Sequence, residues 1–288
     1  MKNNYKDYLI ITISLLFLYF SIINNKIINN SIVSSINLWI NNVFPSLFPM
    51  ILINNILLDY NFSYYIIKLL KSNGIKYYVI ILSLLSGSPS NAIIIKELYQ
   101  TKVINKNDAN NLLIYTYFSN PIFLTTMLSL TFNISTTRKI IIICYLSNFI
   151  ISFIYKIKPT NLKNIKNIKH SISSSITKTM STLIMILGTI CFYILLSTFF
   201  ITLFNLDNIS SLFVKGFFEL TQGLNYLSNI NICLVLKEII AIIFISFGGF
   251  SIHAQIKSIL SDANLSYKCF LYGRFLSMLI SVFLIILL

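Results

Sequence analysis

The sequence is poor in acidic residues, in glycine and proline, and in charge of either sign. It has 8 Asp and Glu residues in 288, against 22 Lys and Arg, and only 10% of all residues are charged. A soluble domain carries about a quarter charged residues. Because 56% of the residues are hydrophobic, the composition excludes an ordinary soluble protein. We predict an all-α, polytopic integral membrane protein whose single membrane domain covers residues 1–288.

Cysteine pairs and enzyme signatures are also missing. The four cysteines are scattered through apolar segments with no close pair: Cys144, Cys191, Cys233 and Cys269. Zinc knuckles and disulfide frameworks need closer or paired spacings. The chain has no HExxH, P-loop or GxSxG motif, and only two histidines. We therefore expect no enzymatic activity, no cofactor and no metal ion.

The basic excess gives a net charge of +14. The basic residues do not form a face interleaved with aromatic residues, so the pattern does not favour a nucleic-acid partner. Lysines beside the apolar runs of the first half and in the linker are instead expected to face the cytoplasm and the anionic lipid surface. By the count of predicted spans, Lys215, Lys237, Lys257 and Lys268 fall on or near the outer side. The expected partner is the lipid bilayer, and the pattern indicates no oligomeric state.

Long apolar runs supply the predicted architecture. A span needs about 20 apolar residues, and six runs are predicted to cross the membrane: 8–23, 31–58, 109–137, 140–155, 179–206 and 269–288. The first has no small-residue cleavage motif after it and is expected to stay uncleaved. The lysine-rich stretch 156–178 is predicted to be a cytoplasmic basic linker between a first half, 1–155, and a second half, 179–288.

Glycine and proline interrupt two uncharged apolar stretches. The tip Ser86-Gly87-Ser88-Pro89-Ser90 lies inside 77–95, and the tip Phe247-Gly248-Gly249-Phe250-Ser251 lies inside 239–256. Such residues end helices and free backbone N–H and C=O groups, which hydrocarbon cannot satisfy.

Lysines on both flanks of 77–95 favour a re-entrant hairpin, although a spanning helix that contains proline remains an alternative. Each half has a long span, a short amphipathic piece (60–73; 209–228), an interrupted hairpin and a final span. The two orientations are opposite. This order predicts an inverted repeat with two re-entrant helical hairpins, although the lysines of the second half do not fix its orientation.

Polar residues at the tips and near them are candidates for holding a solute. Ser90 and Ser251 precede short helical runs and are predicted N-caps. A helix N-terminus at mid-membrane presents free N–H groups and partial positive charge. The predicted substrate-binding residues are Ser86, Gly87, Ser88, Pro89, Ser90, Asn120, Glu219, Gly248, Gly249, Ser251, His253 and Gln255.

Each of these residues also has a purely structural interpretation. Glycine and proline at the tips permit close helix packing, and Asn120 with Pro121 forms a helix kink. Glu219 fits the surface of an amphipathic helix at the interface. His253 and Gln255 fit buried residues that bond to a neighbouring helix. The equivalent places of the two tips favour the solute site.

Both tips and their neighbours resemble the YlbJ family of sporulation integral membrane proteins. The similar stretches are 86–92, 96–99 and 118–121 in the first half and 219–223 and 248–255 in the second. That family belongs to a wider group with a nucleoside-recognition or Gate domain, similar in pattern to concentrative nucleoside transporters and ferrous-iron permeases. Ser88 and Asn91 stand where the family usually has an aromatic residue and a second glycine.

The resemblance implies a role in endospore formation, in the phase in which the cortex is built. It further implies passage of dipicolinate, a small aromatic dicarboxylate, across the membrane around the forespore. We expect a multi-pass protein of the cell membrane or outer forespore membrane that transports a small anionic solute. A nucleoside-type permease and a non-transporting membrane scaffold for spore-envelope assembly are the alternatives.

Overall fold

The computed structural model describes residues 4–60, 62, 65–66, 69, 74–157 and 171–288. All regular structure in these residues is helical, which confirms the predicted all-α class. Residues 158–170 of the predicted basic linker lie outside the described residues. So does most of 61–73, where the first short amphipathic piece is predicted.

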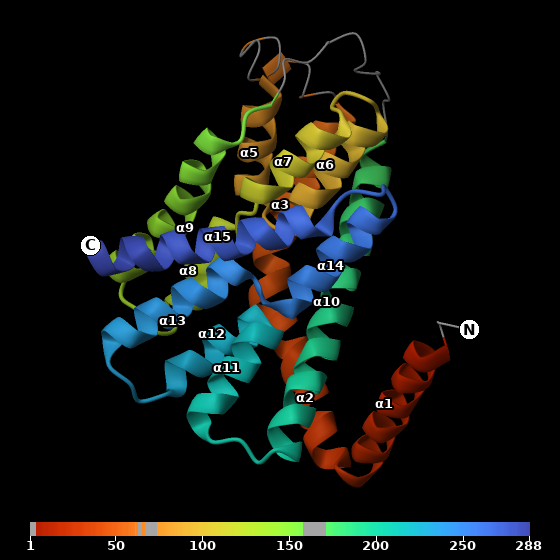
Figure 1. The fold of residues 1–288 in the computed structure, drawn as a ribbon, viewed down its shortest axis with the longest axis vertical. Helices are drawn as coiled ribbons and strands as arrows, with labels where there is room; N and C mark the ends of the chain where they lie inside the picture. The colour runs from red at the N-terminus through yellow and green to blue at the C-terminus, as the bar shows by residue number, and fades with distance from the viewer. Residues whose placement is uncertain (1–3, 61, 63–64, 67–68, 70–73, 158–170) are drawn as a thin grey trace.

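The helices follow one another closely along the chain (Figure 1). The first half contains α1 (Asn4–Ile23), α2 (Asn25–Leu38), the π-helical turn η1 (Trp39–Val43), α3 (Phe44–Asp59), α5 (Gly74–Ser86), α6 (Ser90–Gln100), α7 (Lys106–Tyr115), α8 (Pro121–Leu128) and α9 (Ile134–Ile154). The second half contains α10 (Ile172–Leu203), α11 (Asn208–Phe218), α12 (Leu220–Asn229), α13 (Leu234–Phe247), α14 (Gly249–Ser261) and α15 (Tyr267–Leu287).

Among the described residues, five helical segments are long and apolar enough to cross a membrane: 25–59, 134–154, 172–203, 234–261 and 267–287. Four of them overlap predicted spans. The run 8–23 forms a shorter apolar helix. The predicted span 109–137 is divided instead, because α7 ends at Tyr115 and Asn120 caps a new helix that starts at Pro121.

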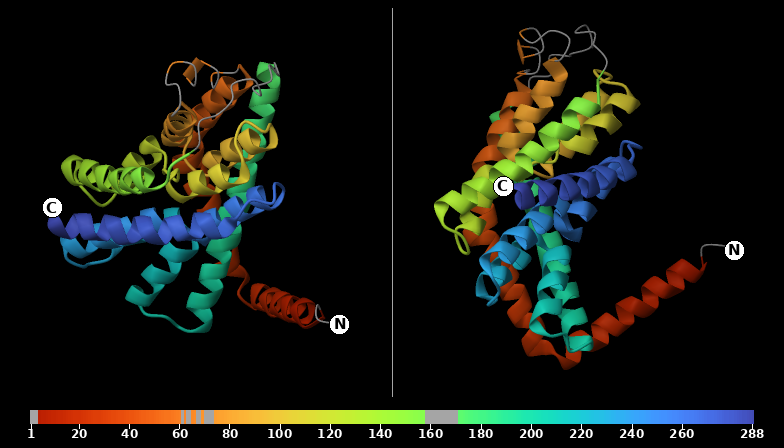
Figure 2. Two further views of the ribbon diagram at one scale, coloured as in Figure 1. Left: turned by 45° about the horizontal axis from the view of Figure 1, so that its top comes forward. Right: turned by 60° about the vertical axis from the view of Figure 1, so that its left-hand side comes forward.

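Two long helical segments form the spine of the molecule. The continuous run α2–η1–α3 packs along α10, and α15 crosses the molecule against α7, α9 and α13. Helix α1 leans away from this body (Figure 2). It touches the body through Phe17 and Phe20, whose rings lie 5.7 and 4.9 Å from the ring of Phe199.

Two pairs of consecutive helices fold back on themselves. Helix α5 packs against α6, and α11 packs against α12. The second pair meets at two glycines, since a Cβ on Gly223 would lie 2.2 Å from the Cα of Gly216. The turn between α11 and α12 is made by Glu219 alone, in an extended conformation.

The break at Gly248 has a different shape from the hairpin predicted for 239–256. Gly248 adopts the left-handed conformation, with φ of +93°. Helix α14 then continues in roughly the direction of α13 (Figure 1), and the two together are long enough for one span. The element that folds back in the second half is therefore α11–α12, which covers most of the predicted amphipathic piece 209–228.

The glycine contact between α11 and α12 generates the first prediction. Gly223→Ala places a Cβ against the backbone of Gly216, and overpacking of this kind costs about 1–3 kcal/mol. The melting temperature of the detergent-solubilised protein should fall. Gly188→Ala is the matched control, because nothing lies within 4 Å of its added Cβ and alanine favours the helix. Equal melting temperatures of the two variants would contradict the packing argument.

Candidate functional site

Both predicted tips converge on one small cavity. Its polar lining comes from four helix breaks: Ser88; Ser119 and Asn120; Glu219 and Thr221; and Ser251 and Gln255. Its apolar wall comes from Val43 and Leu47 on the first spine segment and Ile186 and Ile190 on α10. The volume is about 50 Å³, which is room for a few water molecules.

Each of the four breaks brings the N-terminus of a helix to this cavity. Helix α6 begins at Ser90, α8 at Pro121, α12 at Leu220 and α14 at Gly249. The first N–H groups of a helix have no partner inside the helix, and that end carries partial positive charge. The cavity is therefore a place for hydrogen-bond acceptors and negative charge.

Two of the four N-termini are capped by side chains of the chain itself. Asn120 Oδ1 accepts hydrogen bonds from the N–H groups of Ile122 (2.9 Å) and Phe123 (3.1 Å) at the start of α8. Its amide nitrogen donates to the carbonyl of Leu85 (2.7 Å), at the end of α5. Asn120 thus joins the break between α7 and α8 to the first tip.

Glu219 caps α12 in the same way. One carboxylate oxygen accepts from the N–H of Gln222 (2.7 Å), and the other accepts from the hydroxyl of Thr221 (3.0 Å). The residue is only 2% exposed. Burial of a carboxylate is costly unless such bonds satisfy it. Glu219 therefore lines the cavity, and each of its carboxylate oxygens already accepts one hydrogen bond from within the chain.

The other two N-termini, those of α6 and α14, have no side-chain cap. The predicted caps Ser90 and Ser251 do not form, because Ser90 is already the first residue of α6 and Ser251 the third of α14. Their hydroxyls, and that of Ser88, are buried without a hydrogen-bond partner among the described residues. Ser88 and Ser251 line the cavity. Two uncapped helix ends with two uncommitted hydroxyls therefore face the same space.

The predicted glycines shape the tips. Gly87, Gly248 and Gly249 all have left-handed φ angles, of +72°, +93° and +70°. A Cβ on Gly87 would lie 2.8 Å from the backbone nitrogen of Asn120, and one on Gly248 would lie 2.6 Å from the hydroxyl of Tyr117. Both tips thus need glycine for their backbone angles and for their close approach to the break between α7 and α8.

The remaining tip residues of the first half have structural contacts. The Ser86 hydroxyl donates to the carbonyl of Leu82 (2.7 Å), within α5. Pro89 precedes α6, where a residue without an N–H group leaves no donor unsatisfied. Neither side chain lines the cavity. Their part is to end one helix and begin the next.

Gln255 and His253, on the same helix, have different surroundings. Gln255 lines the cavity, and its amide nitrogen donates to the hydroxyl of Thr189 on α10 (2.6 Å). His253 Nε2 lies 3.0 Å from the carbonyl of Phe247, and Nδ1 lies 2.8 Å from the hydroxyl of Tyr267. Because a carbonyl only accepts, Nε2 carries a proton. His253 therefore bonds to the end of α13 and is not among the residues that line the cavity.

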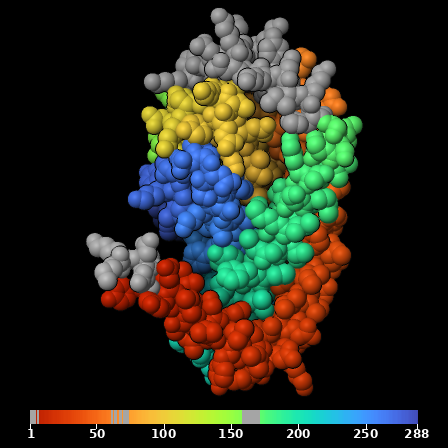
Figure 3. All heavy atoms as spheres, turned by 90° about the vertical axis from the view of Figure 1, so that its right-hand side faces the viewer, coloured from red at the N-terminus to blue at the C-terminus, as the bar shows by residue number. Residues whose placement is uncertain are grey.

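A wider groove approaches the cavity between α6, α10 and α14, the helices that meet on the face shown in Figure 3. Its volume is about 830 Å³, and many of its lining residues are polar: Asn55, Lys96, Glu97, Gln100, Ser174, Thr177, Lys178, Ser181 and Thr182. On α10, Met185 lines the groove and the next residue, Ile186, lines the cavity. On α14, Ile259 lines the groove and Gln255 lines the cavity. The groove thus ends about one helical turn from the cavity.

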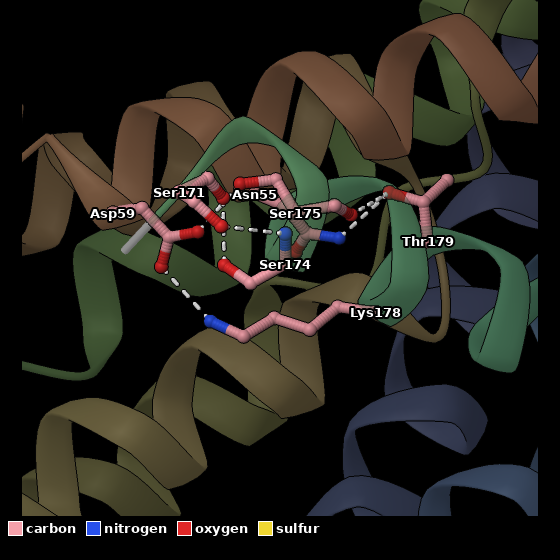
Figure 4. Close-up of polar contacts among 7 residues, drawn as sticks. All are labelled: Asn55, Asp59, Ser171, Ser174, Ser175, Lys178 and Thr179. Atoms are coloured by element: carbon pink, nitrogen blue, oxygen red, sulfur yellow. Dashed lines mark hydrogen bonds and ion pairs between the residues drawn. The ribbon is translucent and has the colours of Figure 1, made fainter. Parts of the chain in front are cut away.

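A polar cluster fixes the spine at the mouth of this groove (Figure 4). Buried Asp59, at the end of α3, accepts from the hydroxyl of Ser175 (2.6 Å) and pairs with the ammonium group of Lys178 (2.9 Å) on α10. One turn earlier, Asn55 donates to the hydroxyl of Thr179 (3.0 Å). On the other side of the groove, Lys96 of α6 pairs with Asp262 after α14 (2.7 Å).

A second cluster, around Arg274 on α15, was not predicted from the sequence. Arg274 on α15 is completely buried, and it contacts Tyr117, Asn148 and the ends of two broken helices. Its signal was a single cation inside an apolar run, which usually marks a functional position. Its partners lie far away in the sequence, so the pairing was not visible.

The bridging position of Asn120 generates the second prediction. Asn120→Ala removes the cap of α8 and the bond to α5 at a buried site. A lost cap costs about 0.5–2 kcal/mol, and a buried group left unsatisfied costs about 1–3 kcal/mol. The melting temperature should fall clearly. Asn133→Ala is the control, because Asn133 caps α9 from an exposed position through one bond to the N–H of Thr136. A larger loss for Asn133→Ala would contradict the bridging role.

Comparison with known proteins supports the membrane location. No protein-family model matches the chain, and no solved structure gives a significant match. A curated protein of Bacillus subtilis (strain 168), "Sporulation integral membrane protein YlbJ", is 24% identical over 300 aligned residues. The alignment covers 84% of this chain and 73% of that protein. The similarity confirms the resemblance predicted from the tip motifs. Because the described residues also include five helices long and apolar enough to cross a membrane, the chain is a multi-pass integral membrane protein.

Proposed function

We propose that this protein moves a small anionic solute across a membrane of the sporulating cell, without catalysing a reaction. The observation that carries the proposal is the pair of uncapped helix N-termini, α6 and α14, which face one cavity with the free hydroxyls of Ser88 and Ser251. Such ends bind anions through N–H groups and partial positive charge. The sporulation role follows from the similarity to the Bacillus subtilis protein.

Dipicolinate suits this arrangement chemically. It carries two carboxylates, so that each helix end would bind one of them, and its ring would lie against Leu47, Ile186 and Ile190 in the apolar wall. A cavity of about 50 Å³ is small beside the several hundred Å³ of a typical ligand pocket. We interpret the present arrangement as a closed state, in which the solute enters only after the tips separate.

The four helix breaks also favour an inverted repeat. The order α3, α5–α6, α7–α8, α9 has a counterpart in α10, α11–α12, α13–α14, α15. Their packing is reciprocal as well, since α7 contacts α15 and α13 contacts α9, while α6 contacts α14 and α12 contacts α8. In this proposal α5–α6 and α11–α12 are the re-entrant hairpins, and the solute lies where the repeats meet, as in secondary transporters.

Glu219 limits which solutes fit. An ionised carboxylate at the cavity repels an anion, whereas a protonated one donates a hydrogen bond to it. The bonds from Thr221 and Gln222 partly offset its charge. We therefore propose that an anionic solute is accommodated best when Glu219 is neutral, which would link solute binding to a proton.

The groove between α6, α10 and α14 is the proposed route to the cavity. Most of its lining residues are polar, it is far larger than the cavity, and it lies at the end of α10 that follows the basic linker. The linker lysines would place this mouth on the cytoplasmic side. Gln255, bonded to Thr189, stands between groove and cavity and would have to move to admit a solute.

The solute proposal generates the third prediction, on uptake of radiolabelled dipicolinate by proteoliposomes that contain the full chain. Ser88→Ala and Ser251→Ala each remove a hydroxyl from the cavity and should raise the KM about 5- to 10-fold, as expected for a lost hydrogen bond of about 1 kcal/mol. Ser83→Ala is the control, because its hydroxyl is also buried and unbonded but does not line the cavity.

Two outcomes would contradict this proposal and favour the alternatives. Uptake blocked by uridine and not by unlabelled dipicolinate would indicate a nucleoside-type permease. No uptake above protein-free vesicles, for dipicolinate or uridine, would indicate a scaffold in spore-envelope assembly.

The proposed route generates the fourth prediction. In a chain without its four cysteines, Ser181→Cys should react with a charged, membrane-impermeant thiol reagent, and dipicolinate should slow the reaction. Ile184→Cys, on the exposed apolar face of α10, should not react because lipid covers it. Equal labelling of the two positions would contradict a water-filled route along α10.

A further inference from the structure

Two broken helices end close to each other on the side of the breaks away from the cavity. Helix α7 ends at Tyr115, and α13 ends at Phe247. The last carbonyls of a helix have no partner inside the helix and carry partial negative charge. Two such ends that converge in an apolar interior need a cation or several donors between them.

Arg274 on α15 supplies the cation. Its guanidinium donates to the carbonyl of Ile114 on α7 (3.2 Å), to the carbonyl of Ser246 on α13 (3.4 Å) and to Asn148 Oδ1 on α9 (3.0 Å). Its Cζ atom lies 4.2 Å from the ring centre of Tyr117, in the break between α7 and α8. One side chain therefore touches both broken helices and one of the breaks themselves.

The surroundings hold this group through its two terminal nitrogens, whereas its Nε is buried without a hydrogen-bond partner among the described residues. Arg274 is 0% exposed, and none of the salt bridges among the described residues gives it a carboxylate partner. Its charge is stabilised by carbonyl dipoles, one amide oxygen and an aromatic face. Gly273 makes the approach possible, since a Cβ there would lie 2.0 Å from the Ile114 carbonyl oxygen. Asn148 is oriented by donating to the carbonyl of Tyr117 (2.8 Å).

In secondary transporters with broken helices, unwound carbonyls and half-helix C-terminal ends coordinate the coupling Na⁺. Here the carbonyls at these ends bind a guanidinium that belongs to the chain. We propose that Arg274 is a built-in counter-ion that takes the place of a coupling cation between α7 and α13. The solute then moves without Na⁺ bound at this position. This inference rests on the proposed transport function, but its first test does not.

The test compares melting temperatures of the solubilised full chain in sodium, potassium, guanidinium and N-methylglucamine chlorides at one low ionic strength. The wild-type melting temperature should be the same in sodium and potassium. Arg274→Ala should melt several degrees lower, and guanidinium or Na⁺ should restore part of that loss where N-methylglucamine does not. Arg138→Ala, which alters an exposed arginine on α9, should show no cation-specific shift.

A wild-type chain stabilised by Na⁺ over K⁺ would overturn the inference, and so would an Arg274→Ala chain that no small cation restores. If Arg274→Ala does not fold, Arg274→Lys replaces it. Lysine keeps the positive charge at this position with a single donor group, so a small added cation should not raise the melting temperature of this variant. A melting temperature raised by Na⁺ would count against the inference. In proteoliposomes, uptake by the wild type should not change when K⁺ replaces Na⁺. Absence of any uptake would refute transport while the melting data still decide the role of Arg274.

Discussion

The structure depends on one constraint: every helix that breaks inside an apolar body frees backbone donors at one end and acceptors at the other. At the breaks after α7 and α13 this chain separates the two kinds of group, whereas the Leu85 carbonyl at the end of α5 bonds to Asn120 at the cavity. The N–H ends of α6, α8, α12 and α14 face the cavity, where Asn120 and Glu219 cap two of them. The C=O ends of α7 and α13 face away from it, toward Arg274 and His253. The uncapped ends of α6 and α14 thus present partial positive charge to the cavity, and Arg274 provides a cation for the carbonyl ends of α7 and α13.

The ion pairs beside the groove indicate which elements would move if the cavity opens as we propose. The spine helices α3 and α10 are held at the groove mouth by buried Asp59, which bonds to Ser175 and Lys178. By contrast, α6 and α14 are joined at the rim by Lys96 and Asp262, a pair with an exposed carboxylate, and exposed pairs contribute little to stability. In the proposed transport cycle, the tips on α6 and α14 would separate, with the bond from Gln255 to Thr189 broken, while the spine and the cluster at Arg274 stay in place.

Much of this could be predicted from sequence because glycine and proline mark breaks locally. The breaks at 86–90 and 247–251 were predicted at the right residues, and the cavity brings both tips together with Asn120, Glu219 and Gln255. The break at Glu219 contains neither glycine nor proline. It forms where the backbone of Glu219 is extended and its side chain caps the next helix. The sequence therefore suggested that the fold-back lay at 239–256 and not at α11–α12. The roles of His253 and Arg274 depend on carbonyls brought close only by folding, which local pattern does not reveal.

The central claim is that the solute lies between the uncapped N-termini of α6 and α14. The most direct measurement is an experimental structure of the full chain in a membrane mimetic with dipicolinate. The account predicts solute density within hydrogen-bond distance of Ser88, Ser251 and the first N–H groups of both helices, with the cavity wider than it is here. Density bound elsewhere, for example along α1 or in the separate pocket that is lined by His253 and Lys257, with the tips still closed, would contradict it.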